Sequence, residues 1–324
     1  MVPGTMRRFT LLACALIAAA AAAAEPAILR IGYFPNITHA QGVIGAQGTR
    51  AGKGWFEQRL GSEITVQWFA FNAGPSAMES IFAGSLDATY VGPNPALNAY
   101  IRSHGDEIRI LAGSAEGGAA LVVPGDSPLA KPEDFRGKRI GTPQLGNTQD
   151  VAARVWCLAH GLRVTLTGGD ATILPTPNPD QLGLFQAGKL DAVWTVEPWV
   201  SRLVLEGKGR IFLEEKDAVT TVLVASVKLL RERPELAAKL RAAHVELTAW
   251  INAHSDEAQA QVRAGLSAAV RREVSAELVA AAWSRLHFTD RIEQGTMEKI
   301  MTDAQTTGLL KTPIPLDRLF SGKP

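Results

Sequence analysis

The sequence has few of the features that hold a chain together from outside an apolar core. It contains two cysteines, Cys14 and Cys157, and the first lies in an N-terminal segment that we expect to be removed. One remaining cysteine cannot form an internal disulfide, so packing must stabilise the rest of the chain. Cys157 falls within an apolar helical run, residues 151–158, which favours a small buried side chain over a nucleophile.

The sequence also has no excess of charge of either sign. The formal net charge is +1, with 33 lysines and arginines against 32 aspartates and glutamates. This balance excludes the electrostatic footprint of a nucleic-acid partner or of an acidic membrane surface. An apolar content of 46% with only 6% aromatic residues is typical of a soluble globular protein, and 324 residues are enough for two domains.

The sequence lacks the motifs that carry catalysis or bind metals. It has no G-x-S-x-G, no H-E-x-x-H, no P-loop and no G-x-G-x-x-G after a strand. His244 and His254 lie in a helical stretch with many charges, and we interpret them as surface side chains rather than metal ligands. We therefore expect no enzymatic activity, no metal and no cofactor.

The N-terminus is typical of a targeting segment. Arg7 and Arg8 precede an uncharged apolar run, residues 9–24, which is too short to span a membrane easily and is rich in alanine. This pattern predicts a secretory signal peptide cleaved close to Ala24. Twin-arginine export and lipidation of Cys14 are alternatives. No later run reaches the ~18 apolar residues of a membrane span, so we expect no second membrane segment.

Two copies of one sequence plan organise the rest of the chain. The pattern A-G-x-L-D-A occurs at residues 83–88 and again at 187–192, each time after a helix-like run and before a strand-like one. Arg30-Ile31-Gly32 likewise returns as Arg139-Ile140-Gly141. Pieces repeated in a constant order predict two similar α/β lobes, with any ligand bound between them.

Strand-like runs alternate with helical runs in both copies, and residues 64–69 of the first are matched by 171–176 of the second. This βαβ order predicts a mostly parallel sheet flanked by helices in each lobe. The β-branched run 219–226 is the expected return crossing, and the chain after Lys228 is expected to be helical. We expect lobe 1 to comprise residues 25–119 and 220–324, and lobe 2 residues 120–219.

Several helices of this plan begin with small, amide or hydroxyl residues directly after a strand. In a parallel sheet, ligands bind at the carboxyl ends of the strands, where these helices begin. Each start offers unpaired backbone N–H groups and roughly half a positive charge, so several starts around one cleft can bind a small oxyanion without a lysine. Ordinary capping explains any single start. The starts are Gly74-Pro75-Ser76, Pro93-Asn94-Pro95, Gly146-Asn147-Thr148-Gln149 and Asn178-Pro179-Asp180.

Two further groups follow strand-like runs. Asn36, Thr38 and His39 supply an amide, a hydroxyl and an imidazole after the first strand. At the third strand of the second copy come Trp194, Glu197, Pro198 and Trp199, where two indoles that flank a carboxylate can wall a pocket and accept a donor. The alternatives are that His39 is a capping or structural side chain, that Glu197 caps the next helix and that Trp199 is a core residue.

These residues together carry a family resemblance. Residues 30–39 (RIGYFPNITH), the two A-G-x-L-D-A repeats, residues 146–150 (GNTQD) and Glu197-Pro198-Trp199 resemble the periplasmic solute-binding proteins of ABC importers for nitrate, sulfonates and taurine. The resemblance extends from about Ile28 to Leu247. That group is also similar to thiamine-precursor-binding proteins and to a pyrimidine-forming enzyme, whose cysteine cluster this sequence lacks.

The resemblance implies an α/β, two-lobed type II periplasmic-binding-protein fold, a "Venus flytrap" that closes on a solute between its lobes. It implies a periplasmic protein, expected to be a monomer, that delivers the solute to ABC permease and ATPase subunits at the inner membrane. By position, it implies ligand contacts from Asn36, Thr38, His39, Gly74, Ser76, Asn94, Gly118, Asn147, Thr148, Gln149, Trp194 and Glu197.

The expected function is therefore capture of a small sulfonate-type oxyanion. Glu197 is hard to reconcile with a bare anion such as nitrate, because a buried carboxylate beside an anion is costly, and it favours an amino-sulfonate or another polar ligand. One alternative is an exported enzyme or binding protein for a pyrimidine, a thiamine precursor or another nitrogen heterocycle, with His39 and Glu197 as acid and base. A sensor subunit that presents its ligand to a receptor is another.

Overall fold

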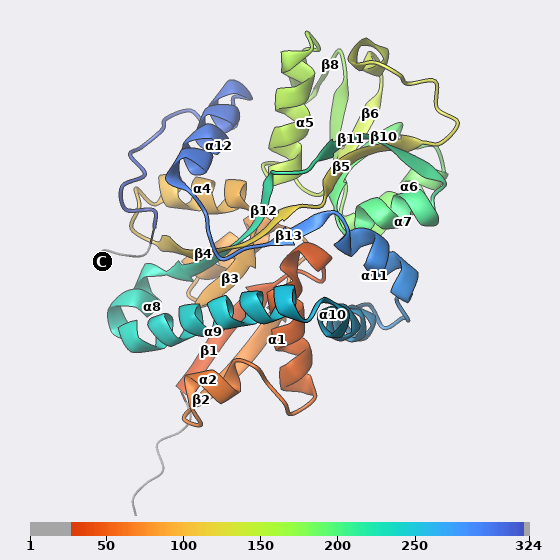
Figure 1. The fold of residues 1–324 in the computed structure, drawn as a ribbon. Coiled ribbons are helices and arrows are strands. Elements are labelled where there is room, and N and C mark those ends of the chain that lie inside the picture. Colours follow the sequence, from red (N-terminus) through yellow and green to blue (C-terminus); the bar gives the residue numbers. More distant parts are fainter. Residues whose placement is uncertain (1–26, 321–324) are drawn as a thin grey trace, which may run out of the picture.

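The computed structural model describes residues 27–320 and contains two large β-sheets, each flanked by helices (Figure 1). The first sheet has the strand order β13-β4-β12-β3-β1-β2, and the second has the order β11-β5-β10-β6-β9. We call the part built on the first sheet lobe 1 and the part built on the second lobe 2. Figure 1 shows lobe 2 above lobe 1, with β5 and β12 running between them.

The strands have the following bounds. In lobe 1 they are β1 Ala27–Tyr33, β2 Ile64–Ala70, β3 Ala88–Val91, β4 Ile108–Gly117, β12 Val219–Ser226 and β13 Leu286–Phe288. In lobe 2 they are β5 Ala119–Pro124, β6 Arg139–Thr142, β9 Thr172–Pro175, β10 Ala192–Val196 and β11 Gly209–Glu215, with a small pair β7 Val164–Thr165 and β8 Gly168–Gly169.

The helices fall into an early and a late group. The early ones are η1 Ile37–His39, α1 Ala40–Arg50, α2 Glu57–Leu60, α3 Gly74–Phe82, α4 Pro93–Arg102, η2 Pro132–Phe135, α5 Thr148–Ala159, α6 Asn178–Gln186 and α7 Trp199–Leu205. The late ones are α8 Val227–Glu232, α9 Pro234–Ala253, α10 Ser255–Val270, α11 Ala276–Trp283 and α12 Gln294–Thr306.

The two sheets repeat one topology. Strands β2-β1-β3 of lobe 1 correspond to β9-β6-β10 of lobe 2, and both sets pair in parallel. In each sheet an antiparallel strand then separates the third parallel strand from the fourth: β12 lies between β3 and β4, and β5 lies between β10 and β11. The predicted fold class, a two-lobed α/β protein with mostly parallel sheets, is confirmed.

The antiparallel strands are also the connections between the lobes. The chain passes from β4 through Gly118 into β5, and it returns from β11 through residues 216–218 into β12. After the first crossing, β5 lies in the interior of the lobe 2 sheet, and after the second, β12 lies in the interior of the lobe 1 sheet. Each lobe therefore needs the strand that follows a crossing to complete its hydrogen-bond ladder. Two short extended segments therefore join the lobes, and segments of this kind can absorb the backbone rotation of a hinge.

The repeated sequence motifs meet one another within each lobe. The backbone N–H and Nε of Arg30 donate to Asp87 Oδ2 at 2.8 and 3.1 Å, and its Nη1 donates to the carbonyl of Gly84 at 2.7 Å. Arg139 repeats these bonds with Asp191 at 2.8 and 2.9 Å and with the carbonyl of Gly188 at 2.8 Å. The A-G-x-L-D-A motif therefore ties the turn before the third strand to the first strand, and it has a structural role in both lobes.

The C-terminal part differs from the prediction of helices alone. Helices α9 and α10 do pack on lobe 1, against α2 and α1 respectively, but α11 contacts α7 of lobe 2 and α12 contacts both α4 and α5. Residues 286–288 form β13, a strand on the edge of the first sheet that pairs antiparallel with β4. A run of three residues is too short to show a detectable alternation. These residues form a strand because they pair with β4. The strand β11 was likewise not predicted.

His244 is buried, which corrects its interpretation as a surface residue. Its side chain is 0% exposed, with Nδ1 at 3.1 Å from the Tyr90 hydroxyl and Nε2 at 2.8 Å from the carbonyl of Gly113. The signal was present in the sequence, because His244 lies four residues after Leu240 and seven before Ile251, on the buried stripe of α9. His254, at the end of the same helix, is exposed as expected.

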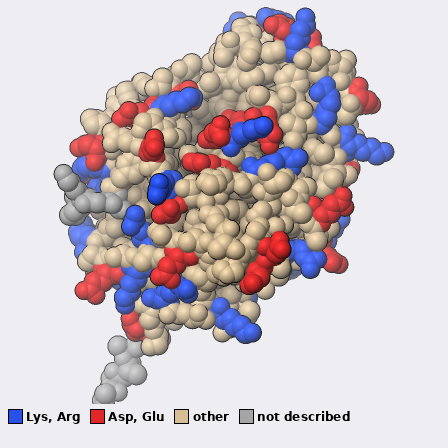
Figure 2. Space-filling model, in the orientation of Figure 1, with Lys and Arg blue, Asp and Glu red and all other residues tan. Residues whose placement is uncertain are grey.

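The predicted signal peptide, with Arg7, Arg8 and Cys14, lies outside the described residues. Within residues 27–320, no helix combines the length and the apolar character needed to cross a membrane. Figure 2 shows basic and acidic side chains interspersed over the visible face rather than gathered in a field of one sign, which agrees with the near-zero net charge.

Candidate functional site

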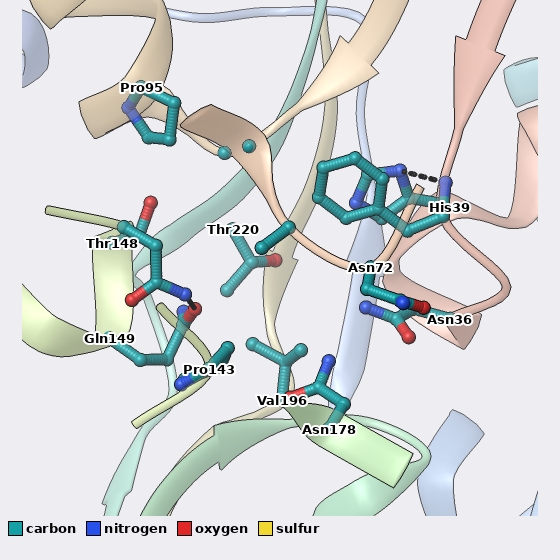
Figure 3. Close-up of a pocket in the computed structure, with 15 residues that line it drawn as sticks. Asn36, His39, Asn72, Pro95, Pro143, Thr148, Gln149, Asn178, Val196 and Thr220 are labelled. Carbon is teal, nitrogen blue, oxygen red and sulfur yellow. Dashed lines mark hydrogen bonds between the residues drawn. The ribbon is translucent and has the colours of Figure 1, made fainter. Parts of the chain in front are cut away.

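A small cavity lies where the two lobes face each other, at the carboxyl ends of the parallel strands (Figure 3). Lobe 1 contributes the loops after β1, β2 and β3, and lobe 2 contributes those after β6 and β9. This is where open parallel sheets bind ligands, because loops and helix starts converge there. The lining residues are Phe34, Asn36, His39, Asn72, Ala73, Gly74, Gly92, Pro95, Pro143, Asn147, Thr148, Gln149, Asn178, Val196 and Thr220.

Helix starts from both lobes surround the cavity. Helices α3 and α4 begin there from lobe 1, and α5 and α6 from lobe 2. Proline occupies the first or second position of α3, α4 and α6, where its missing N–H costs nothing. The side chain of Asn147 caps α5 by accepting from the backbone N–H of Asp150 at 2.8 Å. The partial positive charges of these helix ends create a positive potential without any ionised side chain.

Three amide side chains of the cavity have their oxygens already occupied by protein donors. Asn36 Oδ1 accepts from Trp199 Nε1 at 2.8 Å, and Gln149 Oε1 accepts from Asn147 Nδ2 at 3.1 Å. Asn178 Oδ1 accepts from Gln181 Nε2 at 3.1 Å. Because each oxygen is engaged within the protein, the NH₂ groups of Asn36, Gln149 and Asn178 are what the cavity receives.

His39 is a further donor. Burial lowers its pKa to about 3, so the imidazole is neutral at physiological pH. Its Nδ1 accepts from the backbone N–H of Phe34 at 3.3 Å, and its ring stacks on the Phe34 ring with centroids 4.2 Å apart. A neutral imidazole that accepts at Nδ1 carries its proton on Nε2. His39 therefore presents an N–H at the cavity, as the amides do.

Several buried polar atoms in this region have no hydrogen-bond partner among the described residues. They are Thr38 Oγ1, Asn94 Nδ2 and Thr148 Oγ1. Thr38 is 1% and Asn94 is 3% exposed, so water does not reach them freely. A buried polar group without a partner is costly and usually marks a place where something else binds. Thr148 lines the cavity directly, and its hydroxyl is free to donate to a ligand.

The arrangement selects for a small anion of low charge. Amide NH₂ groups, an imidazole N–H, a hydroxyl and helix N-termini are all donors, and within residues 27–320 the lining includes no lysine, arginine, aspartate or glutamate. Neutral donors can replace the hydration of a delocalised monoanion, because each oxygen needs only hydrogen bonds. A second negative charge on the ligand raises its cost of desolvation, and no charged side chain in the lining offsets that cost.

The lobes are in direct contact across the cavity. Trp199 of lobe 2 donates to Asn36 of lobe 1, and the backbone N–H of Ile37 donates to the carbonyl of Glu197 at 3.2 Å. The cavity volume is about 20 Å³, which is room for roughly one water molecule. A sulfonate group is larger than that, so the lobes have to separate for a ligand to enter and to be accommodated.

The structure brings only part of the predicted contact set to the cavity. The predicted residues that line it are Asn36, His39, Gly74, Asn147, Thr148 and Gln149. Thr38 and Asn94 lie beside it, buried and with unpartnered atoms. Ser76 is exposed in the first turn of α3, where its hydroxyl donates to the carbonyl of Ala73 at 3.4 Å. Gly118, Trp194 and Glu197 are not among the lining residues.

Trp194 and Gly118 have structural positions elsewhere. Trp194 is in the core of lobe 2, and its Nε1 donates to Glu215 Oε2 at 2.7 Å. Gly118 lies at the crossing from β4 to β5 with φ of 70°, a backbone conformation that favours glycine.

Glu197 points away from the cavity, toward the start of the next helix. Its carboxylate accepts from the Ser201 N–H at 3.0 Å, the Ser201 hydroxyl at 2.9 Å and Arg285 Nη1 at 3.2 Å. Burial raises the pKa of Glu197, and the Ser201 and Arg285 donors partly offset that rise. The carboxylate therefore does not face a bound anion, which removes the conflict that its position in the sequence suggested.

Other lining residues were not in the predicted contact set. Asn178 begins α6 as Gly74 begins α3, and it belongs to one of the four helix starts that the sequence pointed to as sites for an oxyanion. Asn72 and Thr220 carried no such signal, because Asn72 precedes a helix by two residues and Thr220 lies inside the crossing strand β12. Only the convergence of both lobes brings them to one cavity.

The buried histidines make stability depend on pH. Burial lowers the pKa of His39 to about 3 and that of His244 to about 4, against 6.5 in the unfolded chain. Well above pH 6.5 both imidazoles are neutral in the folded and in the unfolded chain, so their burial costs no stability there. As the pH falls below 6.5, only the unfolded chain takes up protons, and the free energy of unfolding decreases. At pH 5 each histidine should lower the free energy of unfolding by roughly 2 kcal/mol. Guanidinium titrations at pH 7 and pH 5 measure this difference.

A substitution separates this effect from the titration of carboxylates. His244→Gln should remove roughly 2 kcal/mol of the loss at pH 5, whereas His254→Gln, at an exposed position, should leave the loss unchanged. An identical pH dependence in the His244→Gln variant and the native protein would contradict the assignment.

Comparison with known proteins finds similarity both to solute-binding proteins and to an enzyme. The model of the NMT1-like family matches residues 22–267. The taurine-binding periplasmic protein of Escherichia coli is 28% identical over 148 residues, which is 45% of this chain and 44% of that protein. The 2'-hydroxybiphenyl-2-sulfinate desulfinase of Rhodococcus erythropolis is 27% identical over 166 residues, 49% of this chain and 45% of that one. The chain thus spans about half the length of these relatives.

A solved structure matches over more of the chain. The alkanesulfonate-binding protein SsuA of Xanthomonas axonopodis pv. citri, bound to MOPS, superposes with a TM-score of 0.70 at 21% identity. The match covers 89% of this chain and 94% of that one, so the two share a fold. The family model covers most of the chain and both lobes contribute to it, and we conclude that this chain belongs to the NMT1-like family.

Proposed function

We propose that this protein is the solute-binding component of an ABC importer and that it captures a small sulfonate-type oxyanion between its lobes. The observation that carries the proposal is the set of converging neutral donors: the NH₂ groups of Asn36, Gln149 and Asn178 and the N–H of His39. A sulfonate is a delocalised monoanion, which is the charge state that such a site favours. The taurine- and alkanesulfonate-binding names of similar proteins support the same ligand class.

Capture requires the lobes to move as units. We propose residues 25–119 with 220–324 as one unit and residues 120–219 as the other, joined at the β4–β5 and β11–β12 crossings. Ligand contacts from both lobes would stabilise the closed arrangement over the open one. The Trp199–Asn36 bond joins the two units in that arrangement and orients Asn36 for the ligand at the same time.

The same proposal includes the protein's surroundings. The predicted signal peptide and the similarity to a protein named as periplasmic support a periplasmic location. The partners would be a membrane permease and its ATPase, with the protein acting as a monomer and without nucleic acid.

Similarity to a desulfinase raises the question of catalysis, and the geometry favours binding. The acid–base pair of His39 and Glu197 is not assembled, because His39 lines the cavity while Glu197 binds Ser201 and Arg285. Cys157 is fully buried in the core of lobe 2, and burial raises the pKa of its thiol to about 12. Such a thiol is a poor nucleophile. We therefore propose that the protein binds its ligand without converting it.

A thermal-shift screen of the mature protein tests this function. Methanesulfonate, taurine and nitrate would be compared with thiamine and cytosine as a cation and a neutral heterocycle. A sulfonate at a hundred times its dissociation constant should stabilise the fold by about 2.7 kcal/mol. Stabilisation by the heterocycles alone would overturn the proposed ligand class, and release of sulfite or sulfate during incubation would overturn the non-catalytic role.

A further inference from the structure

A large groove opens beside the oxyanion cavity, between lobe 1, lobe 2 and the connection from α10 to α11. Its volume is about 1090 Å³, against about 20 Å³ for the cavity. Both spaces are lined by Asn36, Asn72 and Asn178, so the groove begins where the cavity ends. Its lining residues come from the end of β2, helix α1, helix α7 and the segment that joins α10 to α11, elements that Figure 1 labels.

The lobe 1 wall is a firmly held indole. Trp68 lies near the end of β2, and its Nε1 donates to Thr49 Oγ1 at 2.9 Å. Tyr33 meets it edge to face with ring centroids 5.9 Å apart, and Phe56 packs against it at 5.3 Å. Gly45 makes room for the ring, since a Cβ there would come within about 2.4 Å of it. Trp68 therefore offers the groove a fixed apolar surface whose polar atom is already satisfied.

The lobe 2 wall includes a second indole, that of Trp199, which is 6% exposed. Trp199 Nε1 donates to Asn36 Oδ1 at 2.8 Å, so this N–H is also engaged within the protein. The guanidinium of Arg202 lies 5.2 Å from the centroid of the Trp199 ring. Trp68 and Trp199 thus present carbon rather than donors, and flat apolar walls of this kind suit the faces of an aromatic ring.

The groove also carries an excess of positive charge. Its lining includes Arg50, Arg202, Arg271 and Arg272, with only Glu206 and Glu273 of opposite sign among the described residues. Arg202 pairs with Glu206 at 3.0 Å. The remaining arginines are exposed at the rim, where their field attracts an anion before it reaches the uncharged donors inside.

We infer that the groove is the second compartment of one ligand site and that the ligand is an aromatic sulfonate, with its oxyanion in the cavity and its ring between Trp68 and Trp199. This inference rests on the proposed function and narrows its substrate class. A two-carbon sulfonate such as taurine would leave a groove of about 1090 Å³ unused, whereas a fused-ring body fills part of it. Because Asn36, Asn72 and Asn178 line both spaces, a ligand with its oxyanion in the cavity extends into the groove past these side chains while the Trp199–Asn36 bond is kept.

Isothermal titration calorimetry with 2-naphthalenesulfonate and methanesulfonate tests the inference on the native protein and two variants. Ala70→Trp places a large ring inside the groove, because Ala70 lines it, is exposed and lies on the same face of β2 as Trp68. Gln67→Trp is the matched control, since Gln67 is exposed on the opposite face of the same strand and does not line the groove. Thermal melting of both variants verifies that they fold.

The native protein should bind naphthalenesulfonate at least about thirtyfold more tightly than methanesulfonate, because the ring buries apolar area that a methyl group does not. Ala70→Trp should remove most of this preference and leave methanesulfonate binding within about threefold, while Gln67→Trp changes neither. Equal affinity for both sulfonates in the native protein, or an equal loss for both in Ala70→Trp, would overturn the inference and leave the proposed function standing. Failure of both sulfonates to bind would overturn the proposed function with it.

Discussion

Gln149→Glu is expected to weaken sulfonate binding by roughly a thousandfold, about 4 kcal/mol. One oxygen of the new carboxylate can still accept from Asn147 Nδ2, which holds Gln149 at 3.1 Å in the native protein. The other oxygen takes the place of the NH₂ group at the cavity, so a donor is lost and a negative charge faces the ligand. Calorimetry of the native protein and the variant with one sulfonate measures the difference.

The charge change has a matched control. Gln261→Glu adds the same charge on the exposed surface of α10, away from the cavity, and should leave affinity within about twofold. The fold should tolerate Gln149→Glu, because an acidic residue in the first turn of α5 interacts favourably with the helix end. Unchanged sulfonate affinity in Gln149→Glu, or a gain of affinity for sulfonates, would contradict the assignment of Gln149 as a donor.

Arg154→Leu is expected to cost about 3–5 kcal/mol of unfolding free energy and to lower the melting temperature by about 10 °C. Arg154 is 2% and Asp150 0% exposed, and Arg154 Nε donates to Asp150 Oδ2 at 3.0 Å. Asp150 also accepts from Thr142 Oγ1 at 3.2 Å and from the backbone N–H of Gly146 at 3.0 Å. Without the arginine, a buried carboxylate would stay unpaired in the first turn of α5, next to Gln149.

Two further variants identify the cause of that loss. Combining Asp150→Asn with Arg154→Leu removes the stranded charge and should recover more than half of the stability. Arg202→Leu breaks a surface pair of the same i,i+4 spacing, with 22% and 36% exposed side chains, and should cost about 0–1 kcal/mol. Equal melting temperatures for Arg154→Leu and the double variant would show that lost packing, and not the unpaired charge, accounts for the effect.

Short-range patterns in the sequence predicted the fold well. The A-G-x-L-D-A repeat marked two lobes, and its Asp87 and Asp191 prove to make the same bonds to Arg30 and Arg139. The β-branched run 219–226 coincides with β12. Such features are local, because alternation, turn residues and helix starts are set by neighbours in the chain. Strands β11 and β13 escaped detection because their pairing partners, and not their own patterns, make them strands.

Side-chain direction was the part that the sequence could not supply. Glu197 follows a strand of lobe 2 as a ligand contact would, yet Arg285, a residue of the C-terminal segment, turns its carboxylate away from the cavity. Asn36 became a donor only because Trp199 of the other lobe occupies its oxygen. Both outcomes depend on contacts between segments distant in sequence, and no residue pattern encodes which atom of an amide is left free.

The position of β12 has a consequence for the order in which the lobes are completed during synthesis. Lobe 2 is continuous from β5 to β11, so all its strands have been made once residue 215 has left the ribosome. Lobe 1 still lacks the strand that fits between β3 and β4, and until residues 219–226 appear those two strands keep unpaired edges. Open edges invite pairing with other chains. A translation product that ended near residue 215 would therefore combine a finished second lobe with an aggregation-prone first one.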